Sequence, residues 1–120
     1  YICTMRHNES ALQCSCKRWF DYQFPKLRQI CFAVPNGSRR DKITGAILKK
    51  EGVVSGCPDM ILLIARNGFG SLCIEFKTEI GKQSENQKMW QRSAEDAGNK
   101  YVICRSFDEF RDTVNAYLHD

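Results

Sequence analysis

Apolar residues recur along the chain in two patterns. Some segments repeat them at helical intervals, which predicts amphipathic helices, while others hold short unbroken runs that predict buried strands. The N-cap residue Asn8 opens the first helix and Pro25 ends it. The expected helices cover about residues 9–22, 43–50, 85–97 and 107–118. The expected strands cover about residues 30–34, 60–65, 71–77 and 101–105.

The resulting order, α-β-α-β-β-α-β-α, favours one α/β domain over residues 1–120, with a mixed central sheet flanked by helices on both faces. Residues 66–70 are typical of a hairpin loop between the two middle strands. The wholly apolar run 60–65 is expected of a strand that is covered on both faces. Two capping boxes mark the starts of the last two helices, and they pair Ser84 with Gln87 and Ser106 with Glu109.

Composition narrows the class of protein without indicating an activity. The chain is 42% hydrophobic and 27% charged, and 18 Lys and Arg against 14 Asp and Glu give a net charge of +4. This mild excess permits a polyanionic partner. No apolar run approaches the roughly 18 residues of a membrane span, and the start lacks a signal-peptide pattern, so we expect a cytoplasmic protein. The seven cysteines lack C-x-x-C spacing, which favours small buried residues in a reducing compartment.

Charged residues interrupt two of the most apolar segments. On the strand 71–77, Glu75 and Lys77 point to one face and lie about 7 Å apart along the strand. If the turn centres near residues 67–68, paired residue numbers sum to about 134 to 136, which places Asp59 beside Glu75 or Lys77. A Glu-Lys pair alone is often a solvated surface pair. Two carboxylates and an amine within apolar segments favour a functional purpose, because buried charge is costly.

Six segments between residues 8 and 90 resemble motifs of one nuclease family in the same order, and the resemblance as a whole covers about residues 8–118. Residues 56–60 (Gly-Cys-Pro-Asp-Met), 74–78 (Ile-Glu-Phe-Lys-Thr) and 87–90 (Gln-Lys-Met-Trp) resemble the PD-(D/E)XK motifs of the VRR-NUC family, the virus-type replication-repair nucleases. The other three resemble the family's first helix, its Pro-Asn-Gly turn and the segment before its Pro-Asp motif, and they comprise Asn8-Glu9 with Gln13, 34–37 and 48–53. The length resembles the stand-alone phage or bacterial branch.

The resemblance implies a Mg²⁺- or Mn²⁺-dependent site, consistent with the preference of hard cations for carboxylate oxygens. The implied metal ligands are Asp59, Glu75, the backbone carbonyl of Phe76 and, as an additional acid, Glu9. Lys77 would handle the nucleophilic water, and Gln87 would orient the Lys77 region or the phosphate. Without the family, Glu9 is an ordinary helix N-terminal charge and Gln87 a capping residue.

Two polar segments are candidates for contact with DNA phosphates. The first is a basic turn that comprises Asn36, Gly37, Ser38, Arg39 and Arg40. The alternative for this turn is a solvated loop. The second segment, Lys82 to Ser84, precedes a helix N-terminus, which favours anions. Trp19 and Trp90 lie at helical spacing and are expected in the core rather than as base-stacking platforms.

The sequence therefore predicts a metal-dependent DNA endonuclease, and the resemblance implies structure-selective cutting of branched or flapped DNA in replication, repair or recombination. The alternatives are a sequence-specific restriction-type endonuclease and a DNA-binding module that does not cut. We also expect a homodimer in the cytoplasm of a bacterial or phage-infected cell. The apolar residues available for pairing are those of the first and last helices, namely Leu12, Trp19, Phe20, Phe107, Phe110, Val114 and Leu118. The alternative is that they form the core of one chain.

Overall fold

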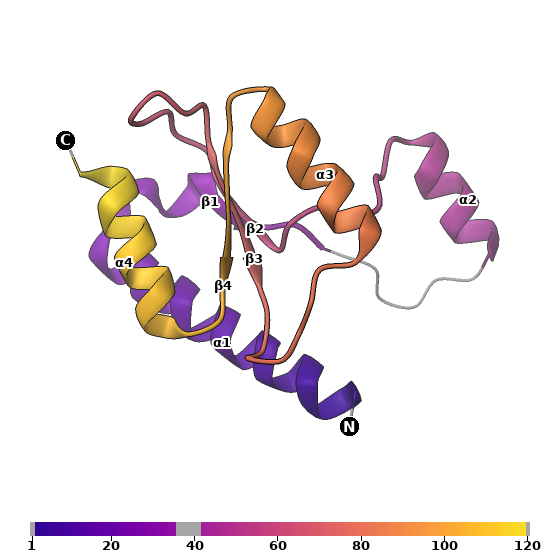
Figure 1. Cartoon of the computed structure of the whole chain (residues 1–120), viewed down its shortest axis with the longest axis horizontal. Helices are drawn as coiled ribbons and strands as arrows, with labels where there is room; N and C mark the ends of the chain where they lie inside the picture. Colours follow the sequence, from indigo (N-terminus) through magenta and orange to yellow (C-terminus); the bar gives the residue numbers. More distant parts are fainter. Residues whose placement is uncertain (1, 36–41, 120) are drawn as a thin grey trace.

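A four-stranded mixed sheet forms the centre of the molecule (Figure 1). Its strands are β1 (Cys31–Ala33), β2 (Met60–Leu62), β3 (Leu72–Phe76) and β4 (Lys100–Cys104), in that spatial order. β1, β2 and β3 pair antiparallel, whereas β3 and β4 are parallel. The computed structural model describes residues 2–35 and 42–119, and side chains for residues 8–35 and 45–119.

The β2–β3 hairpin determines the register that matters for the site. Asn67 (φ 53°) and Gly68 (φ 84°) occupy the left-handed region at its tip, as a tight hairpin turn requires. Met60 pairs with Ile74 and Leu62 with Leu72, which confirms the predicted register. The next step of the same register places Asp59, just before β2, opposite Glu75.

Helices cover both faces of the sheet (Figure 1). One face is covered by α1 (Ile2–Gln23) and α4 (Phe107–Leu118), and α3 (Glu85–Asp96) covers the other. Alternation along β3 explains the division. Its even-numbered residues lie in the hydrophobic core under α1 and α4, and Glu75 therefore points toward α3. A 3-10 helix, η1 (Pro25–Ile30), precedes β1, and α2 (Lys42–Lys50) lies outside these layers at one side.

Three local predictions were wrong. The first helix begins at Ile2, so Asn8 lies inside it rather than at its cap, because no Gly or Pro in residues 2–7 interrupts the helix. β2 ends at Leu62, and Leu63 is 56% exposed, because the partner strand β1 is only three residues long. The second capping box is half formed. Ser106 accepts from the Glu109 amide, but the Glu109 carboxylate accepts from the Arg105 amide instead of the cap.

The apolar residues of α1 and α4 that sequence analysis offered for a dimer interface lie in the chain's own core. Phe20, Phe110 and Val114 are fully buried against the sheet. Trp19 contacts the rings of Phe24, Phe107 and Phe110 edge to face. These surfaces are therefore used within one protomer, because the sheet face beneath them needs a cover.

The remaining predictions from composition agree with the structure in part. Cys31, Cys73 and Cys104 are buried as expected, while Cys14 is exposed, and the cysteines of the described part form no disulfide. Trp90 is half-buried, touches the Tyr101 ring and lies outside the main core cluster. Within residues 2–35 and 42–119, no helix is long and apolar enough to cross a membrane.

Candidate active site

The end of β3 holds a buried carboxylate beside an amine. Glu75 is 2% exposed, and its Oε2 atom lies 3.6 Å from Nζ of Lys77. The Lys77 amide donates to the Cys104 carbonyl at 3.1 Å, which extends the β3–β4 ladder by one residue. The lysine is thereby held on the same strand face as Glu75, with 12% of its side chain exposed.

Asp59 joins this pair from the neighbouring strand. Its Oδ2 atom accepts a hydrogen bond from the Phe76 amide at 2.8 Å, between Glu75 and Lys77 in the chain. Its backbone carbonyl accepts from the Val34 amide at 2.9 Å, and from Nε2 of Gln13 at 3.5 Å. Three elements therefore fix the position of Asp59, which is half-buried next to Glu75.

Gln87 connects α3 to Glu75. Its Nε2 atom donates to Oε2 of Glu75 at 3.0 Å, while its Oε1 atom accepts from the Ser84 amide at 2.9 Å. Ser84 in turn accepts from the Gln87 amide at 3.2 Å, which completes the capping box. The side-chain amide of Gln87 thus caps the helix through its oxygen and orients the buried Glu75 carboxylate through its nitrogen. The Ser84 hydroxyl accepts and the Ser84 amide donates within this cap, and the predicted contact of Ser84 with a phosphate stays a prediction.

Gly56 allows the loop before Asp59 to pack directly on α3. Its φ is +88°, and a Cβ at this position would lie 2.4 Å from the Asn86 carbonyl oxygen. Asn86 also donates to the Ser55 hydroxyl at 2.9 Å. Only glycine permits this close approach. The contact fixes the loop that carries Asp59 against the helical turn that carries Gln87.

The buried Glu75 carboxyl lies beside a second carboxylate, that of the half-buried Asp59. Burial, and then the adjacent Asp59, raise the pKa of the Glu75 carboxyl from 4.5 to about 8; Lys77 opposes this rise and Glu9 adds to it. Oε1 of Glu75 is buried and finds no hydrogen-bond partner among the described residues. An unpartnered oxygen and a second carboxylate fit a hard divalent cation. No group of three or more His, Cys, Asp or Glu side chains in the described part of the chain could hold a metal, so a cation here would also need carbonyl, water or phosphate oxygens.

Glu9 approaches the same site from α1. Its Oε2 atom accepts from the Thr78 amide at a long 3.4 Å. The structure therefore brings Glu9, Asp59, Glu75, Lys77 and Gln87 together from two helices and the ends of two strands.

Comparison with known proteins identifies this arrangement. The sequence profile of the VRR-NUC domain matches residues 3–108. The chain belongs to the VRR-NUC domain family. A solved structure named "VRR_NUC domain protein" superposes with a TM-score of 0.79 at 24% identity, over 92% of this chain and 87% of that chain, which shows the same fold. No curated protein matches. A VRR-NUC domain is a nuclease domain of the PD-(D/E)XK type, a hydrolase whose substrate is a nucleic acid, and the family generally uses a divalent metal.

A cleft adjoins Asp59 in this VRR-NUC domain. A cavity of about 400 Å³ has Asp59, Ser84 and Gln87 on one side, and Leu48 and Lys49 of α2 on the other. A second cavity of about 400 Å³ shares some of its lining and reaches Trp90; the shared residues are Pro35, Val53, Val54 and Cys57. Asp59 is therefore open to this cleft along α2 and α3, while Glu75 lies buried behind it.

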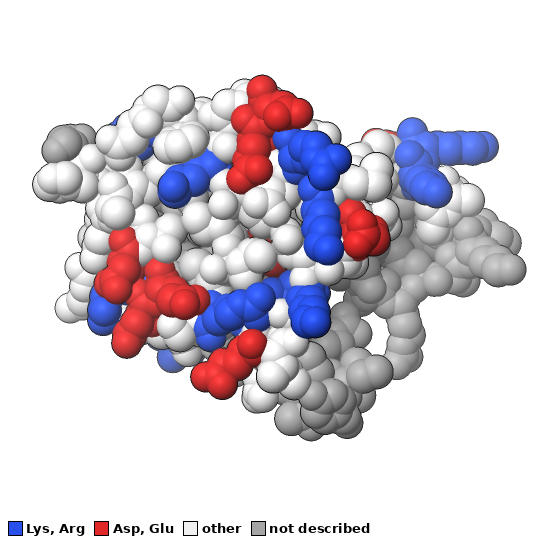
Figure 2. Space-filling model, in the orientation of Figure 1, with Lys and Arg blue, Asp and Glu red and all other residues white. Residues whose placement is uncertain are grey.

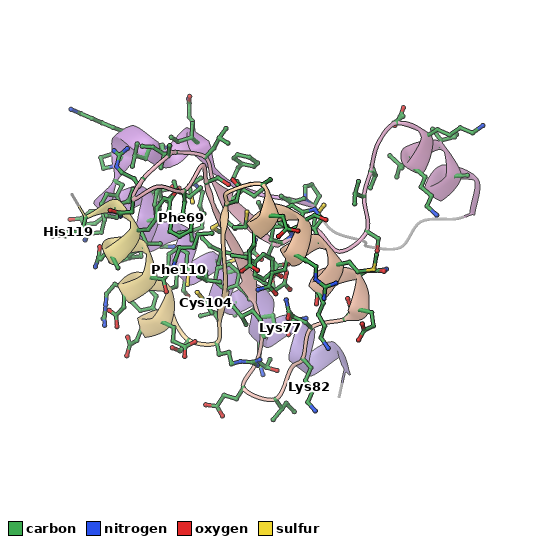
Figure 3. The ribbon with its side chains drawn as sticks, turned by 45° about the horizontal axis from the view of Figure 1, so that its top comes forward. Phe69, Lys77, Lys82, Cys104, Phe110 and His119 are labelled. Carbon is green, nitrogen blue, oxygen red and sulfur yellow. The ribbon has the colours of Figure 1, made fainter. Side chains whose placement is uncertain are left out.

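Basic side chains, interspersed with acidic ones, lie on the two helices beside this cleft. Figure 2 shows Lys and Arg over α3 and on α2, where the sequence supplies Lys88, Arg92, Lys49 and Lys50. Lys82 is exposed below Lys77 (Figure 3) and remains available for a phosphate contact. The predicted basic turn lies outside the described residues; it comprises Asn36, Gly37, Ser38, Arg39 and Arg40.

Three residues around the site had no role predicted from the sequence: Gly56, which lies in the Pro-Asp motif, and Gly81 and Arg105, which lie outside every motif. Gly81 is buried against the stem of Lys77, and the Arg105 guanidinium holds the loop after Lys77. The local signal for the positive φ of Gly56 is the glycine itself, whereas the contacts of Arg105 arise only from the pairing of β4 with β3.

Proposed function

We propose that Asp59, Glu75 and Lys77 are the catalytic centre of a Mg²⁺- or Mn²⁺-dependent DNA nuclease. The observation that carries the proposal is the cluster at the end of β3, where Asp59 is anchored on the Phe76 amide and Glu75 keeps one buried oxygen unpartnered among the described residues. Burying two like charges is costly, so their retention favours a cationic ligand.

In this proposal Asp59 and Glu75 hold the metal, with the Phe76 carbonyl as a further ligand and Glu9 as an additional acid at the site. The bound metal would lower the pKa of a water molecule and neutralise charge on the phosphate. The Lys77 amine positions that water for attack on phosphorus and offsets charge on the phosphoryl oxygens. Gln87 orients Glu75 through its 3.0 Å hydrogen bond.

The preferred substrate is proposed to be branched or flapped DNA, cut within the cytoplasm of a bacterial or phage-infected cell. This preference is what the family resemblance implies, and the cleft between α2 and Asp59 gives a nucleic-acid strand access to the site. A sequence-specific restriction-type endonuclease is the second candidate, because the same cluster of carboxylates and lysine serves both activities.

The test is incubation of the purified protein with single-stranded, duplex, flapped and four-way DNA, with and without Mg²⁺. We expect metal-dependent cleavage that favours the branched forms. Cleavage of one duplex sequence alone would support the restriction-type candidate. Binding of every form without cleavage in either Mg²⁺ or Mn²⁺ would contradict the nuclease proposal and support a DNA-binding module.

We further propose that the working unit is a homodimer, because one site cuts one strand and a branch point offers at least two duplex arms. A two-fold pair supplies two sites without new sequence. With the apolar faces of α1 and α4 used in the core, the interface would use other surfaces, and it should bury at least about 1,000 Å². Light scattering should give about twice the 13.8 kDa of one chain. A monomer mass with full cleavage of branched DNA would rule the dimer out.

A further inference from the structure

The loop that follows Lys77 converges on one guanidinium group. Nη1 of Arg105 donates to the carbonyl oxygens of Thr78 and Gly81, each at 2.6 Å, and lies 3.5 Å from that of Glu79. Arg105 directly follows β4, and its own amide is fixed by the Glu109 carboxylate at 2.6 Å. The loop is therefore anchored to the rigid junction of β4 and α4.

The same loop surrounds the catalytic groups of the proposed nuclease. The Thr78 amide donates to Glu9, which joins α1 to the loop. A Cβ at Gly81 would lie 3.4 Å from Cδ of Lys77 and 3.5 Å from Oε2 of Glu9, so the Gly81 backbone forms a wall beside both side chains. Gly81 is itself buried. A shift of this loop would therefore move the stem of Lys77 and the carboxylate of Glu9.

We propose that Arg105 is a positioning residue for catalysis: it holds the loop 78–81 so that Lys77 and Glu9 keep their places around Glu75. This inference rests on the proposed nuclease function. Arg105 acts through the loop, because its guanidinium donates to backbone carbonyls of that loop while its own amide is held by Glu109. A planar guanidinium keeps a fixed geometry toward two carbonyls, which a lysine ammonium on a flexible stem reproduces less well.

The test compares Arg105→Met, which keeps most of the stem but no charge, with Arg105→Lys. Arg111→Met is the matched control, because Arg111 is 41% exposed and pairs with exposed aspartates of α4. Misplacement of reacting groups by about 1 Å can cost about 100-fold in rate. We therefore expect Arg105→Met to lower kcat by roughly 10- to 100-fold with KM unchanged within about twofold. Arg105→Lys should recover part of kcat, and the control should match wild type.

Three outcomes would overturn the inference. Wild-type kcat in folded Arg105→Met would show that the loop needs no such anchor. A raised KM with a salt slope reduced by about 0.9 would make Arg105 a phosphate contact instead. A lower melting temperature with kcat per folded molecule unchanged would make its role structural only.

Gly81→Ala keeps the inference testable if Arg105→Met does not fold. The added methyl group would press on Oγ1 of Thr78 at 3.2 Å and displace the loop while Arg105 stays in place. A lower kcat at constant KM is expected, and an unchanged kcat would refute control by the loop. A wild-type protein that cuts no DNA overturns the proposed function and this inference with it. If the wild-type protein cuts DNA and Arg105→Met is just as active, this inference alone is overturned.

Discussion

The raised pKa of Glu75 predicts a measurable loss of stability as the pH rises. The folded, metal-free protein retains the Glu75 proton up to about pH 8, whereas the unfolded chain releases it near the ordinary value of 4.5. Between these values the unfolded state binds fewer protons, so the free energy of unfolding falls as pH increases. Glu75→Gln keeps the shape of the side chain and removes this dependence.

The magnitude follows from the width of the pH window. Each pKa unit corresponds to about 1.36 kcal/mol, so the rise from 4.5 to about 8 sets an upper limit of about 5 kcal/mol. Water penetration and relaxation around Lys77 reduce this upper limit. As the pH rises from about 5 to about 8.5, we expect the free energy of unfolding of Glu75→Gln to increase by at least about 2 kcal/mol relative to that of wild type.

Urea unfolding in excess EDTA measures this difference, because a bound divalent cation would stabilise the ionised form. Glu85→Gln is the matched control, since that carboxylate is 87% exposed and its surface pair with Lys88 should contribute less than about 1 kcal/mol. If wild type and Glu75→Gln lose stability in parallel across the whole range, the reasoning about buried, repelling carboxylates is refuted.

Three further results are expected. Gly56→Ala should destabilise the fold by at least about 2 kcal/mol, because its Cβ would meet the Asn86 carbonyl at a positive φ. Gly45→Ala, with open space around it in α2, should be neutral or stabilising; equal unfolding midpoints for the two variants would contradict the close packing. Arg39→Ala with Arg40→Ala should weaken binding to all DNA sequences alike and reduce the slope of log K against log salt by about 0.9 for each phosphate that the variant no longer binds; an unchanged slope would mean a solvated turn.

The hairpin register and the central cluster could be predicted because their signals are local. The turn at 67–68 and the strict alternation along β3 determine which residues face each other, and the register then brings Asp59 to Glu75. Apolar spacing also located the helices and strands, although α1 begins earlier and β2 ends sooner than predicted.

Contacts between distant segments could not be predicted in the same way. The Arg105 guanidinium meets the Thr78 carbonyl only because β4 pairs in parallel with β3, and a single sequence does not reveal which strands become neighbours. Apolar spacing on α1 and α4 indicated a buried surface but could not say whether the sheet or a second copy covers it. The N-cap predicted at Asn8 is not formed, because the local preference of Asn for the cap position does not stop a helix that can continue.

The most direct test of the central claim is the rate of Mg²⁺-dependent DNA cleavage by Asp59→Asn and Lys77→Ala, measured together with DNA affinity by gel shift. Asn retains an acceptor for the Phe76 amide, so inactivity of Asp59→Asn would not reflect a missing anchor. Asp112→Asn, with a side chain 69% exposed on α4, is the control. The account predicts that both site variants lose cleavage while they still bind DNA, and that the control cuts normally. Full cleavage by either site variant would contradict the assignment of the catalytic centre.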